Sequence, residues 1–143
     1  MSKVAVVYWS STGNTEDMAH AVVAGATAAG AEAKLIYCSD FDEDQVDSYT
    51  AIAFGCPATG TEQLDEGEFE PMFTSLEAKL NGKPIALFGS HSWGDGEWMR
   101  DWEELCRSYG ANLVAGSVIA EETPDDEALE HCRELGRAVA TLG

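Results

Sequence analysis

Residues 4–15 read Val4-Ala5-Val6-Val7-Tyr8-Trp9-Ser10-Ser11-Thr12-Gly13-Asn14-Thr15, an apolar run followed directly by a loop of small polar residues. The run Val4–Trp9 is apolar on both faces, as a strand must be when helices cover both sides of its sheet. After the loop, apolar residues recur at helical spacing, at Met18, Val22, Ala26 and Ala29. The stretch therefore predicts a buried strand, a polar turn and an amphipathic helix.

The rest of the chain repeats this alternation. Buried strands are predicted at Ala51–Gly55, Ile85–Gly89 and Leu113–Ala120, and an edge strand at Ala33–Tyr37, which contains Lys34. Three further helical stripes consist of Phe69, Phe73, Leu76 and Leu80; of Trp98, Trp102, Leu105 and Tyr109; and of Ala128, Cys132, Leu135 and Val139. Gly30, Gly82 and Gly110 stand where the first three helices should end. Only the step from Tyr37 to Ala51 lacks an apolar helical stripe.

Strands that alternate with helices predict a parallel sheet with right-handed crossovers. We expect an α/β fold, a doubly wound five-stranded parallel sheet of order 2-1-3-4-5 with helices on both faces. No composition break or repeat divides the sequence, so residues 1–143 are expected to form a single domain. Such sheets bind ligands beyond the carboxyl ends of the strands, at the switch point between the first and third strands. The candidate loops are therefore 10–15, 56–65 and 90–97.

The chain is strongly acidic, with 26 Asp plus Glu against 8 Lys plus Arg and a net charge of −18. This charge argues against nucleic acid or an anionic membrane as a partner and favours a basic one, although solubility alone is an alternative reason for the acids. The longest apolar run, Val4–Trp9, is far shorter than the ~20 residues that span a bilayer. With no secretion leader visible, a cytoplasmic location is expected.

The four cysteines, Cys38, Cys56, Cys106 and Cys132, are scattered along the chain. They form no C-x-x-C pair and have no histidine at metal-ligand spacing. We expect them to be small core residues rather than redox or metal sites. The acidic run Asp42–Asp44 and the pair Asp125-Asp126 are interpreted as solvated loop or helix-start acids rather than metal ligands, so no metal site is predicted.

The loop Ser10–Thr15 offers hydroxyl and amide donors, a glycine that can turn backbone amides inward, and a helix N-terminus. This combination predicts a phosphate site, with a helix cap rich in Ser and Thr as the alternative. No Lys follows Gly13, so the loop is not a nucleotide P-loop, and its neutral donors suit a monophosphate.

The other two loops are less specific. Pro57 and Gly60 mark a strand-to-helix turn, whereas Trp93 lies outside the helical period of the tryptophans that follow it. An aromatic residue at the rim of a phosphate crevice suggests stacking on a planar ligand, with a loop anchor as the alternative. No G-x-S-x-G motif is present, so no catalytic residue is assigned.

Several blocks carry a family resemblance. Ser10–Thr15 resembles the phosphate loop of the flavodoxins, and the whole chain is similar to their short, clostridial-type members. The matching blocks are Tyr8-Trp9-Ser10, Glu68-Phe69-Glu70-Pro71, Ala86-Leu87-Phe88-Gly89-Ser90 and Trp93-Gly94-Asp95-Gly96-Glu97-Trp98-Met99-Arg100-Asp101.

This resemblance implies a non-covalent FMN and one-electron transfer at low potential, between quinone, semiquinone and hydroquinone states. It places Ser10, Ser11, Thr12, Gly13, Asn14 and Thr15 at the 5′-phosphate; Ala58, Thr59, Gly60, Thr61 and Glu62 on the inner side of the flavin; and Ser90, His91, Ser92, Trp93 and Gly94 on the outer side. It also implies that Glu62 reaches the flavin N3–H, that Trp93 stacks on the ring, and that the Gly60 carbonyl turns toward N5–H in the semiquinone.

Two positions depart from the family pattern. Thr59 stands where these members usually have Met, so the inner stack is expected to be thinner. His91 stands in place of Tyr, and a histidine so near the flavin is expected to make the potential depend on pH around neutrality.

The expected function is a soluble electron carrier, a monomer that makes transient contacts with basic faces of reductases or oxidoreductases. The alternative is an FMN-dependent quinone or nitro-compound reductase, but the chain lacks a substrate domain, a nicotinamide fingerprint and a lid insertion. A phosphate-responsive regulator would need acids at the end of the first strand, where Trp9 and Ser10 stand. Ten acids in the second and third loops and their helices are expected to disfavour the anionic, fully reduced flavin and so lower its potential.

Overall fold

The computed structural model describes residues 2–11, 13–59, 64–92 and 96–141. Its strands and helices are, in chain order, β1 (Lys3–Tyr8), α1 (Asn14–Ala28), β2 (Glu32–Tyr37), α2 (Glu43–Val46), β3 (Ala51–Gly55), α3 (Phe69–Ser75), β4 (Pro84–His91), α4 (Glu97–Ser108), β5 (Asn112–Leu113), β6 (Val118–Glu121) and α5 (Asp126–Ala140). Short 3-10 turns lie at Cys38–Asp40 and Glu77–Lys79.

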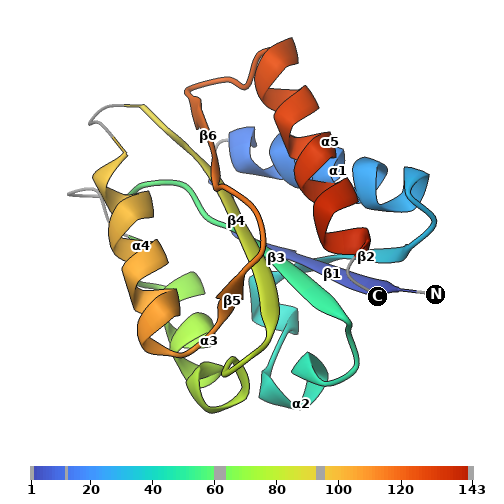
Figure 1. Cartoon of the computed structure of the whole chain (residues 1–143). Coiled ribbons are helices and arrows are strands. Elements are labelled where there is room, and N and C mark those ends of the chain that lie inside the picture. The colour runs from blue at the N-terminus through green and yellow to red at the C-terminus, as the bar shows by residue number, and fades with distance from the viewer. Residues whose placement is uncertain (1, 12, 60–63, 93–95, 142–143) are drawn as a thin grey trace.

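The strands form one parallel sheet (Figure 1). Their order is β2-β1-β3-β4-β5, and β6 also pairs with β4, in register with its carboxyl-terminal half. The predicted α/β class and the predicted strand order are both confirmed. Because β1 and β3 are neighbours and the chain winds outward from them in both directions, their carboxyl ends form the switch point.

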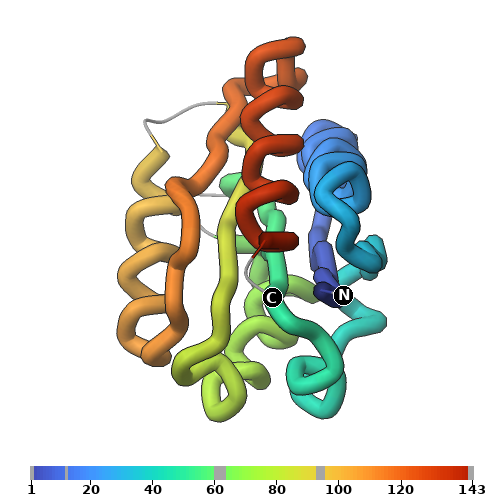
Figure 2. The backbone as a smooth tube through the Cα atoms, turned by 45° about the vertical axis from the view of Figure 1, so that its right-hand side comes forward, coloured from blue at the N-terminus to red at the C-terminus, as the bar shows by residue number. Residues whose placement is uncertain are grey.

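Helices cover both faces of this sheet (Figures 1 and 2). Alternate residues of β1 enter two separate cores. Val4 and Val6 pack with α1 and α5, whereas Ala5 and Val7 pack with side chains from α3 and α4. This explains why the run is apolar on both faces, since neither face of a central strand meets water.

The helices α1 and α5 lie side by side because glycines let their backbones approach. A Cβ at Gly25 would collide with the backbone of Arg133, and a Cβ at Gly136 would collide with the backbone of Val22. Gly30 and Gly110 have φ of 94° and 79° and follow the C-caps of α1 and α4, so they end these helices in the left-handed conformation, as predicted. Gly82, with φ of 77°, also has a left-handed backbone, but it follows the 3-10 turn at Glu77–Lys79 and does not end α3.

Two predicted elements were wrong in their extent. The run Leu113–Ala120 is not one strand, because residues 114–117 separate β5 from β6. This interruption contains Gly116 and Ser117, and the Ser117 hydroxyl donates to Glu103 Oε2 on α4 at 2.7 Å instead of facing a core. The helix predicted over Phe69–Leu80 ends at Ser75, whose hydroxyl donates to the Met72 carbonyl at 2.6 Å. A 3-10 turn then carries the chain to the buried Leu80.

The step without a helical stripe holds only the one-turn helix α2. Asp42 caps it by accepting a hydrogen bond from the Asp44 N–H at 3.0 Å, and the Gln45 side chain accepts one from the Asp42 N–H at 2.9 Å. Val46 is its buried residue. Cys38 and Phe41, which precede α2, are buried in the same core, so this crossover covers the sheet without a longer helix.

Candidate functional site

The loop after β1 folds back over the start of α1. Ser10 Oγ accepts hydrogen bonds from the N–H groups of Gly13, at 3.1 Å, and Glu16, at 3.3 Å. Gly13 has φ of 95°, in the left-handed region, and open space surrounds the position of its absent Cβ. The capping alternative therefore holds for Ser10, whereas the N–H groups of Asn14 and Thr15 begin α1 and have no acceptor within the helix.

A buried hydrogen bond ties this loop to the end of β4. The hydroxyls of Thr15 and Ser90 are 3.0 Å apart, and both residues are at least 96% buried, with exposed fractions of 1% and 4%. Two buried hydroxyls that satisfy each other hold their elements in one relative position. The resemblance named both residues, but nothing in the sequence predicted that they pair.

A pocket of about 320 Å³ lies between the three candidate loops. Its described lining residues are Ser11, Asn14, Pro57, Ala58, Ser90, His91, Ser92 and Glu122. The Ala58 N–H donates to the Ser90 carbonyl at 3.0 Å, so the second and third loops are joined by backbone at the base of the pocket. The structure thus brings together described residues from all three loops selected by the strand order.

The predicted site residues fall into three groups. Ser11, Asn14, Ala58, Ser90, His91 and Ser92 line the pocket. Ser10, Gly13 and Thr15 shape the first loop, and the half-buried Thr59 follows Ala58. The third group lies outside the described residues and consists of Thr12, Gly60, Thr61, Glu62, Trp93 and Gly94. The contact of Glu62 with the flavin N3–H, the turning of the Gly60 carbonyl and the stacking of Trp93 therefore remain predictions.

Two lining residues were missed from the sequence, Pro57 and Glu122. Glu122 has φ of 57° and is the one non-glycine residue with positive φ in the described part of the chain. Its N–H donates to the His91 carbonyl at 2.7 Å, which holds it beside the third loop. No sequence signal marks this position, because a glycine or asparagine is the residue that a left-handed backbone normally selects.

The tryptophan predicted to be core, Trp98, also supports the site. Its indole N–H donates to the Cys56 carbonyl at 3.1 Å, and its ring lies 5.3 Å from that of His91, centroid to centroid. Helix α4 is therefore fixed to the starts of both the second loop and the third. The Cys56 thiol donates to the Pro57 carbonyl at 3.5 Å, and burial raises its pKa, so it stays protonated.

The four cysteines are free and buried, which confirms the prediction that they are core residues. Burial raises the pKa of Cys38, Cys106 and Cys132 to about 12. Thiols with such pKa values are poor nucleophiles and poor metal ligands at neutral pH.

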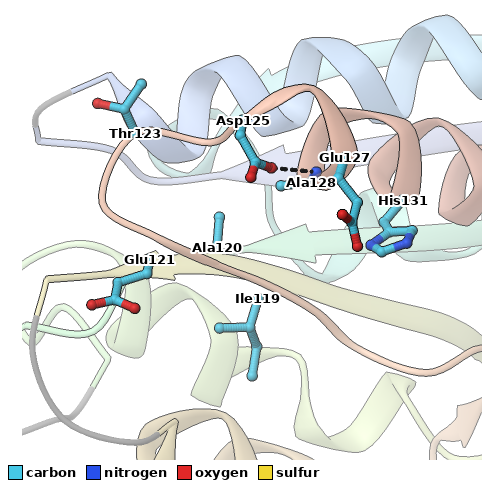
Figure 3. A pocket seen from close by; sticks show the side chains of 8 residues that line it. All are labelled: Ile119, Ala120, Glu121, Thr123, Asp125, Glu127, Ala128 and His131. Atoms are coloured by element: carbon cyan, nitrogen blue, oxygen red, sulfur yellow. Dashed lines mark hydrogen bonds between the residues drawn. The ribbon is translucent and has the colours of Figure 1, made fainter.

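A second cavity, of about 330 Å³, lies between β6 and the start of α5. Figure 3 shows Ala120 pointing toward α5 and Ile119 pointing away from it, with Glu121, Asp125, Glu127 and His131 around the cavity. Asp125 caps α5, because its Oδ1 accepts a hydrogen bond from the Ala128 N–H at 2.8 Å. In the described chain, no group of three or more His, Cys, Asp or Glu side chains suits a metal ion. This second cavity is lined by three acidic residues, Glu121, Asp125 and Glu127, whereas Glu122 is the one acidic residue among the described lining of the pocket beside Ser11. The pocket beside Ser11 is therefore the better candidate for a phosphate.

Comparisons with known proteins agree with this geometry. A family model described as flavodoxin matches residues 6–136. The chain is 45% identical to the flavodoxin of Megasphaera elsdenii, covering 96% of this chain and 98% of that protein. The chain belongs to the flavodoxin family. It is also 42% identical to the flavodoxin of Clostridium beijerinckii, with coverage of 96% and 99%. The solution structure of two-electron reduced Megasphaera elsdenii flavodoxin superposes with a TM-score of 0.89 at 47% identity, over 96% of this chain and 98% of that one.

Membership in the flavodoxin family identifies the cofactor as FMN and the function as electron transfer, without a substrate of the protein's own. The alternative of a quinone or nitro-compound reductase is not favoured. The pocket also fits this cofactor chemically. Its lining includes Ser11 and Asn14, whose side chains can donate to a phosphate monoester at the start of a helix, and the neutral Pro57 and Ala58.

Proposed function

We propose that this protein is a low-potential, one-electron carrier whose FMN lies in the pocket between the loops 10–15, 56–62 and 90–94. The observation that carries this proposal is that Ser11 and Asn14 line the same pocket as Ala58, Ser90 and His91. Bound FMN supplies the chemistry, because it accepts and donates electrons one at a time.

The protein's own residues bind and orient the cofactor in this proposal. The Ser11 hydroxyl, the Asn14 side chain and the first N–H groups of α1 would donate to the phosphate. Ser10 holds the loop over the helix, and the bond between Thr15 and Ser90 fixes its distance from β4. No lysine or arginine lies in residues 10–15, so neutral donors alone would hold the phosphate.

The low potential is supported by charge. Acidic residues follow the second loop at Asp65, Glu66, Glu68 and Glu70, and they follow the third loop at Glu97, Asp101, Glu103 and Glu104. These acids disfavour an additional negative charge in the pocket. Each ~1.4 kcal/mol of such disfavour lowers a one-electron potential by about 59 mV.

The same acids suit transient contact with basic faces of reductases or oxidoreductases, with rates of electron transfer between the proteins that fall as the salt concentration rises.

We propose that residues 1–143 act as a single FMN-binding domain, as a monomer and in the cytoplasm. Four buried free cysteines are compatible with a reducing compartment. The described residues contain no helix of the length and apolarity that a membrane crossing needs.

The test is an absorption spectrum of the purified, FMN-saturated protein during stepwise anaerobic reduction. We expect one FMN per chain and two separate one-electron steps, with no steady oxidation of NADH or NADPH by the protein alone. A protein that takes up no FMN, or one that turns over NAD(P)H with an added quinone, would contradict the proposal.

A further inference from the structure

One carboxylate oxygen joins three segments at the carboxyl edge of the sheet. Glu68 Oε1 accepts a hydrogen bond from the Trp9 indole N–H at 3.0 Å and another from the Tyr37 hydroxyl at 2.9 Å. Trp9 follows β1, Tyr37 ends β2 and Glu68 precedes α3, so the three residues are far apart in the sequence. We call this arrangement the Glu68 clasp.

The backbone under Glu68 is itself fixed. Asp65 Oδ2 accepts hydrogen bonds from the N–H groups of Glu68, at 2.7 Å, and Phe69, at 3.0 Å. Phe69 is fully buried and stacks on Phe73 with ring centroids 5.9 Å apart. The Glu68 carboxylate therefore extends from an anchored position at the end of the second loop.

The donors of the clasp are anchored as well. The backbone N–H of Trp9 donates to the Gly55 carbonyl at 3.0 Å. The next residue is Ser10, which shapes the first loop. Tyr37 packs edge-on against Tyr8 with centroids 5.6 Å apart. Burial and the hydrogen bond to Glu68 raise the pKa of Tyr37, so its hydroxyl remains a donor at neutral pH.

We propose that Glu68 is a positioning residue for FMN, which acts through Trp9 rather than by touching the cofactor. By holding the Trp9 indole at the start of α3, the carboxylate sets the distance between the loop 10–15 and the segment 64–68. The loop is the proposed phosphate site, and the segment follows the loop 56–62, the proposed inner wall of the flavin site. The inference rests on the proposed function, since it requires FMN to lie between these two loops.

The test compares FMN dissociation constants, measured by the quenching of FMN fluorescence, for a set of variants. Glu68→Ala removes the acceptor, and loss of hydrogen bonds to a charged group should raise the dissociation constant about tenfold. Glu68→Gln keeps a carbonyl oxygen at the same place and should restore binding to within about threefold of the parent. Glu77→Ala, which removes an exposed acid from the turn after α3, should leave the constant unchanged.

A double-mutant comparison separates positioning from general destabilisation. Trp9→Phe removes the indole donor and should weaken FMN binding severalfold, and in a Glu68→Ala background the same change should add little, because the clasp is already open. If the two substitutions weakened binding independently, the double variant would show the product of the two single increases in the FMN dissociation constant. The thermal midpoint of each apoprotein, measured in parallel, confirms that the variants are folded at the temperature of the binding assay.

Equal FMN affinity in the parent, Glu68→Ala and Trp9→Phe proteins would overturn the inference and leave the proposed function intact. If Glu68→Ala does not fold, Tyr37→Phe decides the matter together with Trp9→Phe, since each removes one donor and keeps the carboxylate. Unchanged affinity in both would again overturn it. A parent protein that binds no FMN would overturn both the inference and the proposed function.

Discussion

The hydroxyl of Thr15, in the first turn of α1, lies 3.0 Å from the hydroxyl of Ser90 near the end of β4. Both side chains are buried, so each hydroxyl provides the hydrogen-bond partner that water cannot provide for the other. Because Thr15 is the last residue of the proposed phosphate loop and the proposed outer wall begins at Ser90, this single bond fixes two walls of the pocket relative to each other.

Thr15→Val should therefore destabilise the apoprotein by about 1–3 kcal/mol, because it leaves the Ser90 hydroxyl buried without this partner. It should also weaken FMN binding. The free energy of unfolding is measured in urea and the affinity by flavin fluorescence. Thr27→Val, at an exposed threonine of the same helix, is the control and should alter neither quantity.

Gly13→Ala isolates the backbone of the phosphate loop. Open space surrounds the position of the absent Cβ, so the penalty should come from φ of 95° alone, about 1–2 kcal/mol. Gly30→Ala is a matched control, since Gly30 has φ of 94°, open space and a place at the other end of the same helix. Both variants should lose similar stability, but only Gly13→Ala should bind FMN more weakly. Equal FMN affinity in the two variants would show that this loop does not hold the phosphate.

Much of the fold was predictable because its signals are local. Runs that are apolar on both faces marked the central strands, and the strand-helix alternation then left few topologies. The interruption between β5 and β6 was missed because residues 114–117 are small or apolar enough to continue a strand, and the deciding contact, from Ser117 to Glu103, spans two elements.

The site was predictable in part for the same reason. Ser10–Thr15 form a contiguous pattern with a chemical meaning, so the loop could be found without a structure. Glu122 could not, because its place depends on a left-handed backbone and on a hydrogen bond to the His91 carbonyl. The Glu68 clasp joins residues from three segments, and no local pattern encodes such a contact.

The approach of α1 to α5 predicts a purely structural effect. Gly136→Ala places a Cβ against the Val22 carbonyl and the Ala26 N–H of α1, so the two helices must separate. We expect a loss of about 1–3 kcal/mol in urea unfolding. Gly116→Ala, where nothing lies within 4 Å of the added Cβ, should be nearly neutral. Equal stability of the two variants would contradict this account of the helix packing.

The buried thiols predict how stability changes in alkali. Burial raises the pKa of Cys106 and Cys132 from 9.0 to about 12, so the unfolded chain releases these protons first. Their stabilising effect is complete below pH 9 and should disappear as the pH rises toward 12, with a slope of about 1.4 kcal/mol per pH unit for each thiol. Urea unfolding at several pH values between 8 and 11 measures this slope. Cys132→Ala removes one of these thiols and should reduce the slope of stability against pH by about 1.4 kcal/mol per pH unit. An unchanged slope would contradict the raised pKa of Cys132.

The central claim is that neutral phosphate donors and surrounding acids make the bound FMN a low-potential electron carrier. The most direct test is a potentiometric titration of the FMN-loaded protein that resolves its two one-electron steps. The account predicts a second potential well below that of free FMN measured under the same conditions. A second potential equal to that of free FMN, or above it, would contradict the account.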